Sequence, residues 1–284
     1  MNFVYHVIAI IAMSAPNILG FNLIFGRGKI FHFGPLGVSI VAAYATFLTT
    51  MAFGSYPLGL VAGFAAAAIV SAFFAWLSLR LDADGFGVMS IAVHLSLLAV
   101  VLNWTSLTRG ALGIPRVPRF PFLHSTVDFM IFSTIVAVLW AFVLWKIDRG
   151  TFGRKLTALS EHEWHAKALG IDRPFIHLIV FLIGGVGAML TNVQYHQYIY
   201  LVHPSDFGYP AFIFFVTVVV AGGPGSVRGC MLSLVLISLL REGMRFLPLS
   251  ANILGPVRLI LFGVILFVAV WVRRDTLFPK QRTV

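Results

Sequence analysis

Long runs of apolar residues, separated by short polar breaks, dominate the chain. We count nine such runs, near residues 3–26, 31–53, 57–80, 86–102, 128–147, 174–199, 208–221, 229–247 and 253–272. A run of about 20 apolar residues is long enough for an α-helix to cross a membrane. The pattern therefore predicts an all-α polytopic membrane protein with about nine transmembrane helices. The short run at 208–221 widens this prediction to between eight and ten.

No change of composition and no low-complexity linker divides the chain. Two polar stretches, 103–127 and 148–173, are longer than the other breaks. We therefore expect residues 1–284 to form a single transmembrane domain with a cytoplasmic loop at 148–173. The first residues lack the basic n-region of a signal peptide, so we expect the first apolar run to be retained as a helix.

Composition excludes several classes of protein. Hydrophobic residues make up 59% of the chain and charged residues 11%, whereas an average soluble domain is about 25% charged. An ordinary cytosolic enzyme, a disordered chain and a secreted disulfide scaffold are therefore excluded. Cys230 is the single cysteine, which rules out an intrachain disulfide and a cysteine-based metal cluster.

The net charge of +10 would suggest nucleic-acid binding in a soluble protein. Here the basic residues stand at the ends of apolar runs, where an excess marks the cytoplasmic side. If 148–173 is cytoplasmic, the inside set is Arg27, Lys29, Arg80, Lys146, Arg149, Arg154, Lys155, Lys167, Arg173, Arg228, Arg273, Arg274, Lys280 and Arg282. The outside set is Arg109, Arg116, Arg119, Arg241, Arg245 and Arg258. This bias predicts an outer N-terminus, a cytoplasmic C-terminus and no nucleic-acid partner.

The stretch 148–173 carries the clearest local signals. Ser160 and Glu163 have the spacing of a capping box, and Gly170 suits a left-handed helix stop. They predict a helix of about nine residues, roughly 13 Å long, which is too short and too polar to span a membrane. Trp164 and Ala168 would share one side of it. The helix is either a surface connection between two spans or a docking element for a cytoplasmic partner.

The run FGRKLTALSEHEWHAKALGI resembles the cytoplasmic loop of permeases of branched-chain amino-acid ABC importers. The matching residues are Phe152, Gly153, Arg154, Ala158, Glu161, Glu163, Ala166, Ala168, Leu169, Gly170 and Ile171. His162 and His165 depart from the family pattern. The resemblance implies that residues 160–171 couple the chain to an ATPase subunit. The residues assigned to this coupling are Ser160, Glu161, Glu163, Ala166, Ala168, Leu169 and Gly170.

The stretch LNWTSLTRGALGIPRVPRF is similar to an outer loop of the same family. The matching residues are Trp104, Leu107, Thr108, Gly110, Gly113, Ile114 and Pro115, and Arg109 stands where the family often has glycine. Glycine and proline here predict a turn. The stretch is either purely structural or shapes a mouth near a docked receptor. In the second case Trp104, Arg109, Arg116 and Arg119 would face that receptor.

Two glycine-rich stretches, near 26–45 and 220–233, also resemble family motifs. Gly34 and Gly37 belong to the first, and Gly222, Gly223 and Gly225 to the second. Such helix breaks allow tight packing, or line a pathway where cavity or protein covers the exposed backbone. Both roles remain open for these glycines. Their places in the two halves of the chain suggest a duplicated transporter fold.

The chain has no phosphate-binding loop of the G-x-x-x-x-G-K-[ST] type, so we expect no ATPase activity of its own. The nine histidines form no recognisable ligand set, and we predict no metal site or catalytic residue. His94 and His196 lie in or near apolar runs, where a neutral histidine bonded to a backbone carbonyl is the simpler interpretation. Glu242 is expected to pair with Arg241 and Arg245.

The resemblance implies a permease subunit of an ABC importer in a bacterial-type inner membrane, working by alternating access. Its expected partners are ATP-binding subunits, which would use the ATP, a second permease subunit and a periplasmic substrate-binding protein. No cofactor is expected on the chain itself. Family substrates are branched-chain and related amino acids, urea and short amides. The alternatives are a stand-alone secondary transporter or channel for a small polar solute, and a membrane-embedded enzyme.

Overall fold

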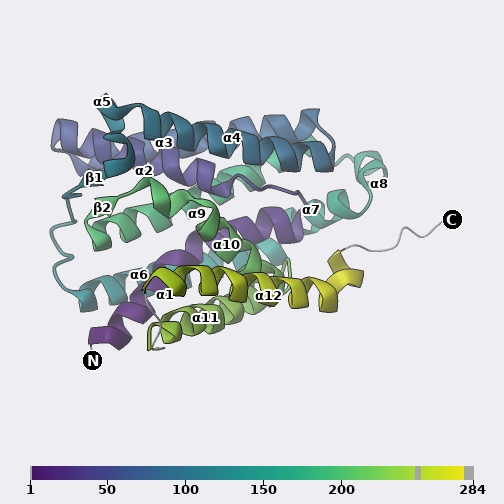
Figure 1. Ribbon diagram of the computed structural model, residues 1–284. Helices are drawn as coiled ribbons and strands as arrows, with labels where there is room; N and C mark the ends of the chain where they lie inside the picture. The colour runs from purple at the N-terminus through teal and green to yellow at the C-terminus, as the bar shows by residue number, and fades with distance from the viewer. Residues whose placement is uncertain (1, 247–250, 278–284) are drawn as a thin grey trace.

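The computed structural model describes residues 2–246 and 251–277, and helices form almost all of it (Figure 1). The α-helices are α1 (Asn2–Phe21), α2 (Pro35–Phe53), α3 (Tyr56–Arg80), α4 (Ala83–Asn103), α5 (Thr105–Thr108), α6 (Thr126–Arg149), α7 (Thr151–Glu161), α8 (Glu163–Ala168), α9 (Arg173–Ile199), α10 (Tyr209–Gly222), α11 (Val227–Gly243) and α12 (Ala251–Leu277). Shorter elements are the π-helix η1 (Asn22–Arg27), the 3-10 helices η2 (Gly110–Leu112), η3 (Pro204–Phe207) and η4 (Met244–Phe246), and the strands β1 (Ile114–Pro115) and β2 (Leu201–Val202). Lys280 and Arg282 of the predicted inside set, and residue 247 at the end of the predicted run 229–247, lie outside the described residues.

The predicted spans correspond to helices in the described part of the chain. Eight of these helices are long and apolar enough to cross a membrane. The remaining predicted run, 229–247, is the eighth in chain order and corresponds to α11, which has 17 residues and packs beside α1 and α10. The all-α polytopic fold, with a number of spans between eight and ten, is confirmed.

Helix α1 lies at the centre of the bundle, and α12 lies at its edge. In the most apolar part of each span, 83% of residues are buried in Asn2–Arg27 and 6% in Ile253–Val272. Helices α6, α9, α10 and α11 all pack against α1. The exposed side chains of α12 include Phe267 and Trp271. Packing within the chain therefore holds α1, while α12 offers its apolar surface to lipid or to another protein.

Pro16 lies inside α1, where proline removes a backbone hydrogen bond and crowds the preceding turn. Neighbouring helices supply the polar partners there. The Trp140 indole donates to the Pro16 carbonyl at 3.0 Å, and the backbone amide of Asn17 donates to the Thr191 hydroxyl at 3.1 Å. Gly187 of α9 approaches the same carbonyl so closely that an added Cβ would overlap it. Helices α6 and α9 therefore both contact α1 at Pro16 and Asn17.

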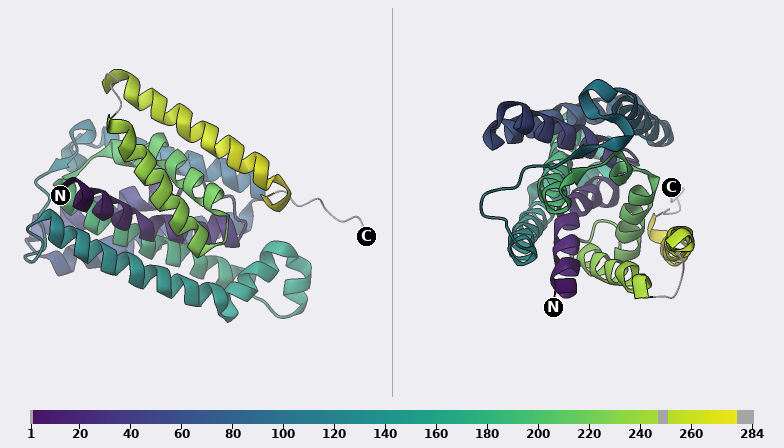
Figure 2. Two further views of the ribbon diagram at one scale, coloured as in Figure 1. Left: turned by 90° about the horizontal axis from the view of Figure 1, so that it is seen from below. Right: turned by 60° about the vertical axis from the view of Figure 1, so that its left-hand side comes forward.

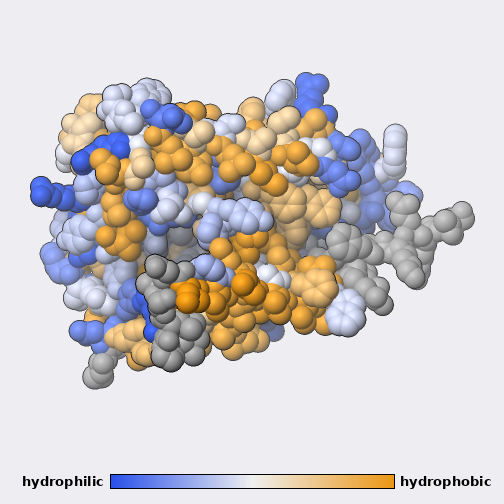
Figure 3. All heavy atoms as spheres, viewed as in Figure 1, coloured by the Kyte–Doolittle hydropathy of each residue, from blue (hydrophilic) through white to orange (hydrophobic). Residues whose placement is uncertain are grey.

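The bundle has two distinct ends. Helices α7 and α8 lie at one end, and α8 projects beyond the long helices (Figures 1 and 2). The antiparallel strands β1 and β2 lie at the other, pairing Ile114 with Val202 and Pro115 with Leu201. Apolar residues cover much of the middle of the face seen in Figure 3, and hydrophilic residues gather towards its two ends. We call these the α7–α8 end and the strand end.

Candidate functional site at the α7–α8 end

The predicted capping box is wrong, because Ser160 lies inside a helix rather than at its start. Helix α7 runs from Thr151 to Glu161, and the Ser160 hydroxyl donates to the Thr157 carbonyl at 2.8 Å. The helix is interrupted at His162, which lies between α7 and α8. Two short helices therefore replace the predicted single helix of about nine residues. Leu156 and Leu159 are buried, and this packing extends α7 through Ser160.

Gly170 stops α8 as predicted. Its φ of +75° is left-handed, a conformation that glycine adopts without steric cost. The Gly170 amide donates to the Lys167 carbonyl at 2.9 Å, and the Ile171 amide donates to the Ala166 carbonyl at 3.0 Å. This pair of bonds is a Schellman motif. The turn out of α8 is therefore fixed by the backbone.

A tight connection fixes α7 to the long helices. An added Cβ at Gly153 would overlap the Asp148 carbonyl oxygen at the end of α6, which gives a physical reason for glycine in the FGR motif. The Arg27 guanidinium pairs with the Asp148 carboxylate at 2.9 Å, joining the end of η1 to the end of α6. Helix α7 also packs against η1 and α9. It is therefore mounted on three membrane-spanning elements.

The tip of the α7–α8 segment (residues 151–170) exposes two large apolar side chains. Trp164 is 83% exposed and Leu169 is 78% exposed. Leu169 belongs to the residues assigned to coupling, and Trp164 does not. Of the others assigned to it, Glu161, Ala168 and Gly170 are exposed, whereas Ala166 is buried and holds α8 in place. Exposed apolar groups on a well-fixed polar segment are typical of an interaction surface. The coupling role of these residues stays a prediction.

Glu163 lies in an ion cluster within the chain. Its carboxylate oxygen Oε1 is 2.8 Å from the Lys167 ammonium and 2.9 Å from Nη1 of Arg173. The bond from Lys167, with that from Arg173, holds the pKa of the Glu163 carboxyl below its ordinary value. Glu163 therefore stays ionised at neutral pH and ties α8 to the start of α9.

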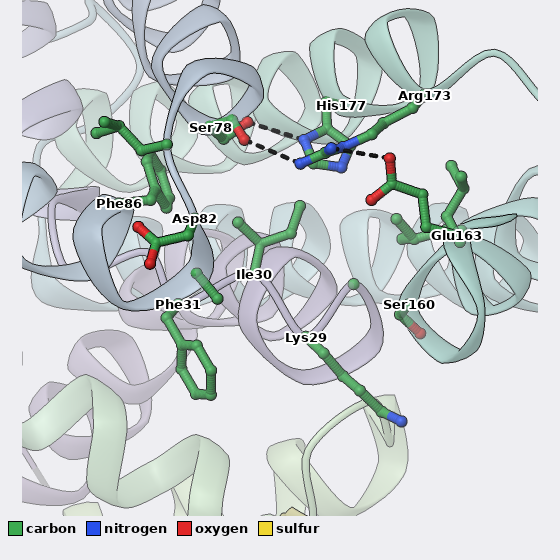
Figure 4. A pocket seen from close by; sticks show the side chains of 15 residues that line it. Lys29, Ile30, Phe31, Ser78, Asp82, Phe86, Ser160, Glu163, Arg173 and His177 are labelled. Atoms are coloured by element: carbon green, nitrogen blue, oxygen red, sulfur yellow. Dashed lines mark hydrogen bonds and ion pairs between the residues drawn. The ribbon is translucent and has the colours of Figure 1, made fainter. Parts of the chain in front are cut away.

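A cavity of about 370 Å³ lies beneath this cluster (Figure 4). It is bounded by the chain after η1, the turn between α3 and α4, helix α7 and the start of α9. Arg173 and His177 approach Ser78 from α9 (Figure 4), with Nη2 of Arg173 3.2 Å from the Ser78 carbonyl and Nδ1 of His177 2.8 Å from the Ser78 hydroxyl. The sequence marks Arg173 only as a positive charge of the predicted inside set, and it gives no role to His177. The signal in the sequence is their i,i+4 spacing, which places both residues on one face of a helix.

At the strand end, the residues predicted to face a receptor differ in their surroundings. Trp104, Arg109 and Arg116 are exposed. Arg109 has a φ of +64°, which explains why glycine suits this position in the family motif. Arg119 instead bonds within the chain, to the Gln197 and Tyr198 carbonyls at 2.8 and 2.9 Å, and stacks on Tyr200. A receptor-facing role of all four residues stays a prediction.

The two glycine-rich breaks meet in space. Gly34 caps the start of α2 and Gly37 lies in its first turn, both against α4. The second break, 223–226, joins α10 to α11, and Gly223 and Gly225 have positive φ values. The Gly225 amide donates to Oδ1 of Asn22 at 2.9 Å. The second break thus packs against η1, whose last residues, Gly26 and Arg27, begin the first glycine-rich stretch. This geometry favours packing for the second break and leaves a pathway role for the others open.

Replacing Asn22 with alanine is expected to destabilise this junction. Asn22 is 2% exposed and Gly225 is half-buried, so loss of the bond to the Gly225 amide is expected to cost about 1 kcal/mol. Thermal unfolding in detergent measures the loss. Asn103→Ala is the control, because exposed Asn103 bonds only the Ala99 carbonyl of its own helix among the bonds described. Equal shifts for the two variants would contradict this prediction.

The ionisable groups near the strand end include half-buried Asp206, which no sequence motif marks. His196 is 1% exposed, and its Nδ1 lies 3.0 Å from the Leu201 carbonyl, as the simpler interpretation expects. The same nitrogen is 4.0 Å from Oδ2 of Asp206. Glu242 pairs with Arg241 at 3.4 Å and Arg245 at 3.0 Å, which confirms the expected ion cluster. Among the described residues, no group of three or more His, Cys, Asp or Glu is placed to hold a metal ion.

Comparison with known proteins gives a consistent result. The family model "Branched-chain amino acid transport system / permease component" matches residues 2–270. The chain is 27% identical to the branched-chain amino acid permease LivM of Salmonella typhimurium, over 93% of this chain and 67% of that protein. It is 23% identical to LivH of Escherichia coli, over 75% of this chain and 76% of that protein. It is 24% identical to the autoinducer 2 import permease LsrC of Photorhabdus luminescens, over 68% of this chain and 57% of that protein.

A solved structure shares the fold. It is PsaBC from Streptococcus pneumoniae in complex with Fab, with a TM-score of 0.53 and 16% identity, covering 100% of this chain and 94% of that chain. The family match extends over nearly all of the described helices, including the α7–α8 segment. The chain belongs to the permease-component family of branched-chain amino-acid ABC transport systems and is a multi-pass inner-membrane protein.

Proposed function

We propose that the chain is one permease subunit of an ATP-driven importer for branched-chain or related amino acids, urea or short amides. The observation that carries the proposal is the α7–α8 segment, in which α8 projects beyond the end of the bundle (Figure 1) and the side chains of Trp164 and Leu169 are exposed. An ATPase subunit of the partner complex would grip this tip. Closure of the ATPase would then switch the bundle between outward and inward access.

The same proposal fixes the orientation and the other partners. The α7–α8 end is cytoplasmic, so the N-terminus lies outside and the C-terminus inside. A periplasmic substrate-binding protein would dock at the strand end, where Trp104, Arg109 and Arg116 are exposed. A second permease, either a paralogue or another copy, would complete the pathway. The ATP is used by the partner subunit, and residues 1–284 act as a single membrane domain without a cofactor of their own.

A stand-alone transporter is the second candidate. Asp206 and His196 favour it, because ionisable groups within a membrane-spanning region commonly mark ion or substrate pathways. The Tyr44 hydroxyl has no hydrogen-bond partner among the described residues and lies within electrostatic reach of Asp206. Such a protein would move its solute without an ATPase.

One experiment separates the two candidates. The tagged chain is purified in mild detergent from its native host, and co-purifying proteins are identified by mass spectrometry. An importer subunit is expected to bring an ATPase with it and to give no uptake of labelled leucine in liposomes that contain the chain alone. Uptake by the chain alone, without ATP, would contradict the importer and support the stand-alone transporter.

A further inference from the structure

Arg173 joins three helices at the base of the α7–α8 segment (Figure 4). It is the first residue of α9, and its Nη1 lies 2.9 Å from Oε1 of Glu163, the first residue of α8. Its Nη2 donates to the Ser78 carbonyl near the end of α3 at 3.2 Å. One planar guanidinium therefore holds the start of α8 against α3 and α9, using the two-pronged geometry that arginine offers.

The electrostatics of the helix ends favour this arrangement. The Ser78 carbonyl belongs to the last turn of α3, where carbonyl groups lack partners in the helix and carry partial negative charge. A cation in the first turn of α9 is disfavoured by the dipole of that helix. Arg173 gains its stabilisation from the α3 carbonyl and the Glu163 carboxylate. Both contacts are therefore needed to hold the arginine in this position.

His177 repeats the link one turn further along α9. The Ser78 hydroxyl donates to the Ala75 carbonyl at 2.7 Å, so its oxygen accepts from Nδ1 of His177 at 2.8 Å. Ser78 and His177 are both buried. Arg173 and His177 together hold α9 against the end of α3, whereas the ion pair between Glu163 and Arg173 links α8 to both. The cavity of about 370 Å³ borders this junction, so side chains do not fill the space next to Arg173 and His177.

We propose that Arg173 is a positioning residue that transmits movement of α8 to helices α3 and α9. This inference rests on the proposed function, in which an ATPase grips the tip of the α7–α8 segment. A pull on α8 reaches Glu163 first, and the ion pair carries it across to Arg173. The Ser78 carbonyl then passes it to the end of α3. Arg173 thus helps to convert closure of the ATPase into transport, whereas the exposed tip provides the docking surface.

The test measures substrate transported per ATP hydrolysed, using the chain purified with its ATPase and receptor and reconstituted in liposomes. Arg173→Gln is expected to co-purify the ATPase at wild-type yield and to lower that ratio by about tenfold, a typical size for a coupling between sites. Arg80→Gln is the matched control. Arg80 is an arginine of the same bundle end that stacks on Trp76, and its loss is expected to leave the ratio unchanged.

Two further variants keep the proposal falsifiable if Arg173→Gln folds poorly. Arg173→Lys keeps the charge but cannot reach Glu163 and the Ser78 carbonyl in one planar group, so an intermediate ratio is expected. The double variant Glu163→Gln with Arg173→Gln is expected to lower the ratio little further than Arg173→Gln alone, because the two residues act through one ion pair. A wild-type ratio in Arg173→Gln overturns the inference, and so does loss of the ATPase from that variant. If the wild-type chain recovers no ATPase, the proposed function itself fails.

Discussion

A chain carrying Gly229→Ala is expected to unfold well below the wild-type temperature, with a loss of about 3 kcal/mol. Gly222 ends α10 and Gly229 lies in the first turn of α11, and the two backbones touch. A Cβ added at Gly229 would overlap the Gly222 carbonyl oxygen, and one added at Gly222 would lie 2.6 Å from the Gly229 carbonyl oxygen. Neither atom can rotate away as a side chain would. Overpacking of this kind typically costs about 1–3 kcal/mol, and the backbone contact places it at the upper end.

Thermal unfolding in detergent, followed by tryptophan fluorescence, checks this result. Gly263→Ala is the matched control, because Gly263 lies in α12 with no atom within 4 Å of the added Cβ. Its unfolding temperature is expected to stay at or slightly above the wild-type value, since alanine favours helix over glycine. A Gly229→Ala chain as stable as this control would show that the helices separate at no cost. The contact would then not stabilise the fold.

The second large effect concerns Trp164 and the affinity for the ATPase. Trp164→Ala is expected to weaken ATPase binding by at least about 2 kcal/mol, or roughly 30-fold, as for a central aromatic anchor of an interface. The exposed indole makes little contribution to folding, so the unfolding temperature of the isolated chain should not change. Affinity is measured with purified ATPase and the detergent-solubilised chain.

Trp76→Ala provides the control for that measurement. Trp76 is 51% exposed near the same end of the bundle, but lies on α3 rather than on the tip of the α7–α8 segment. Its removal is expected to leave the affinity unaltered. If both variants bind as tightly as wild type, the ATPase contacts another surface, and the coupling residues need to be reassigned.

The spans were predictable because length and apolar composition determine them locally. The break between α7 and α8 was not predictable in the same way. Ser160 and Glu163 have a genuine capping-box spacing, but burial of Leu156 and Leu159 against neighbouring helices extends α7 past Ser160. Tertiary packing thus overrode a local signal. Gly170 followed its local signal, because a positive φ depends on the residue itself.

Contacts between distant segments remained outside the reach of a single sequence. The bond between Arg173 and Ser78 joins residues 95 positions apart, and the bond between Asn22 and Gly225 joins residues 203 positions apart. Each of these residues is ordinary in its local context. Asp206 is a further case, because its proximity to buried His196 depends on the fold of η3 against α9 rather than on any motif.

The central place of α1 has a consequence for the biogenesis of the protein. The span Asn2–Arg27 is synthesised before several of its partners, which come from the second half of the chain. They include Thr191, bonded to Asn17 of α1, and Gly225, bonded to Asn22 of η1. Until those segments enter the bilayer, Asn17 and Asn22 lack these partners. Unsatisfied polar groups in lipid are costly. The N-terminal helix therefore depends on late-made segments for its stability, and chains truncated before Gly225 would leave it incomplete and open to proteolysis.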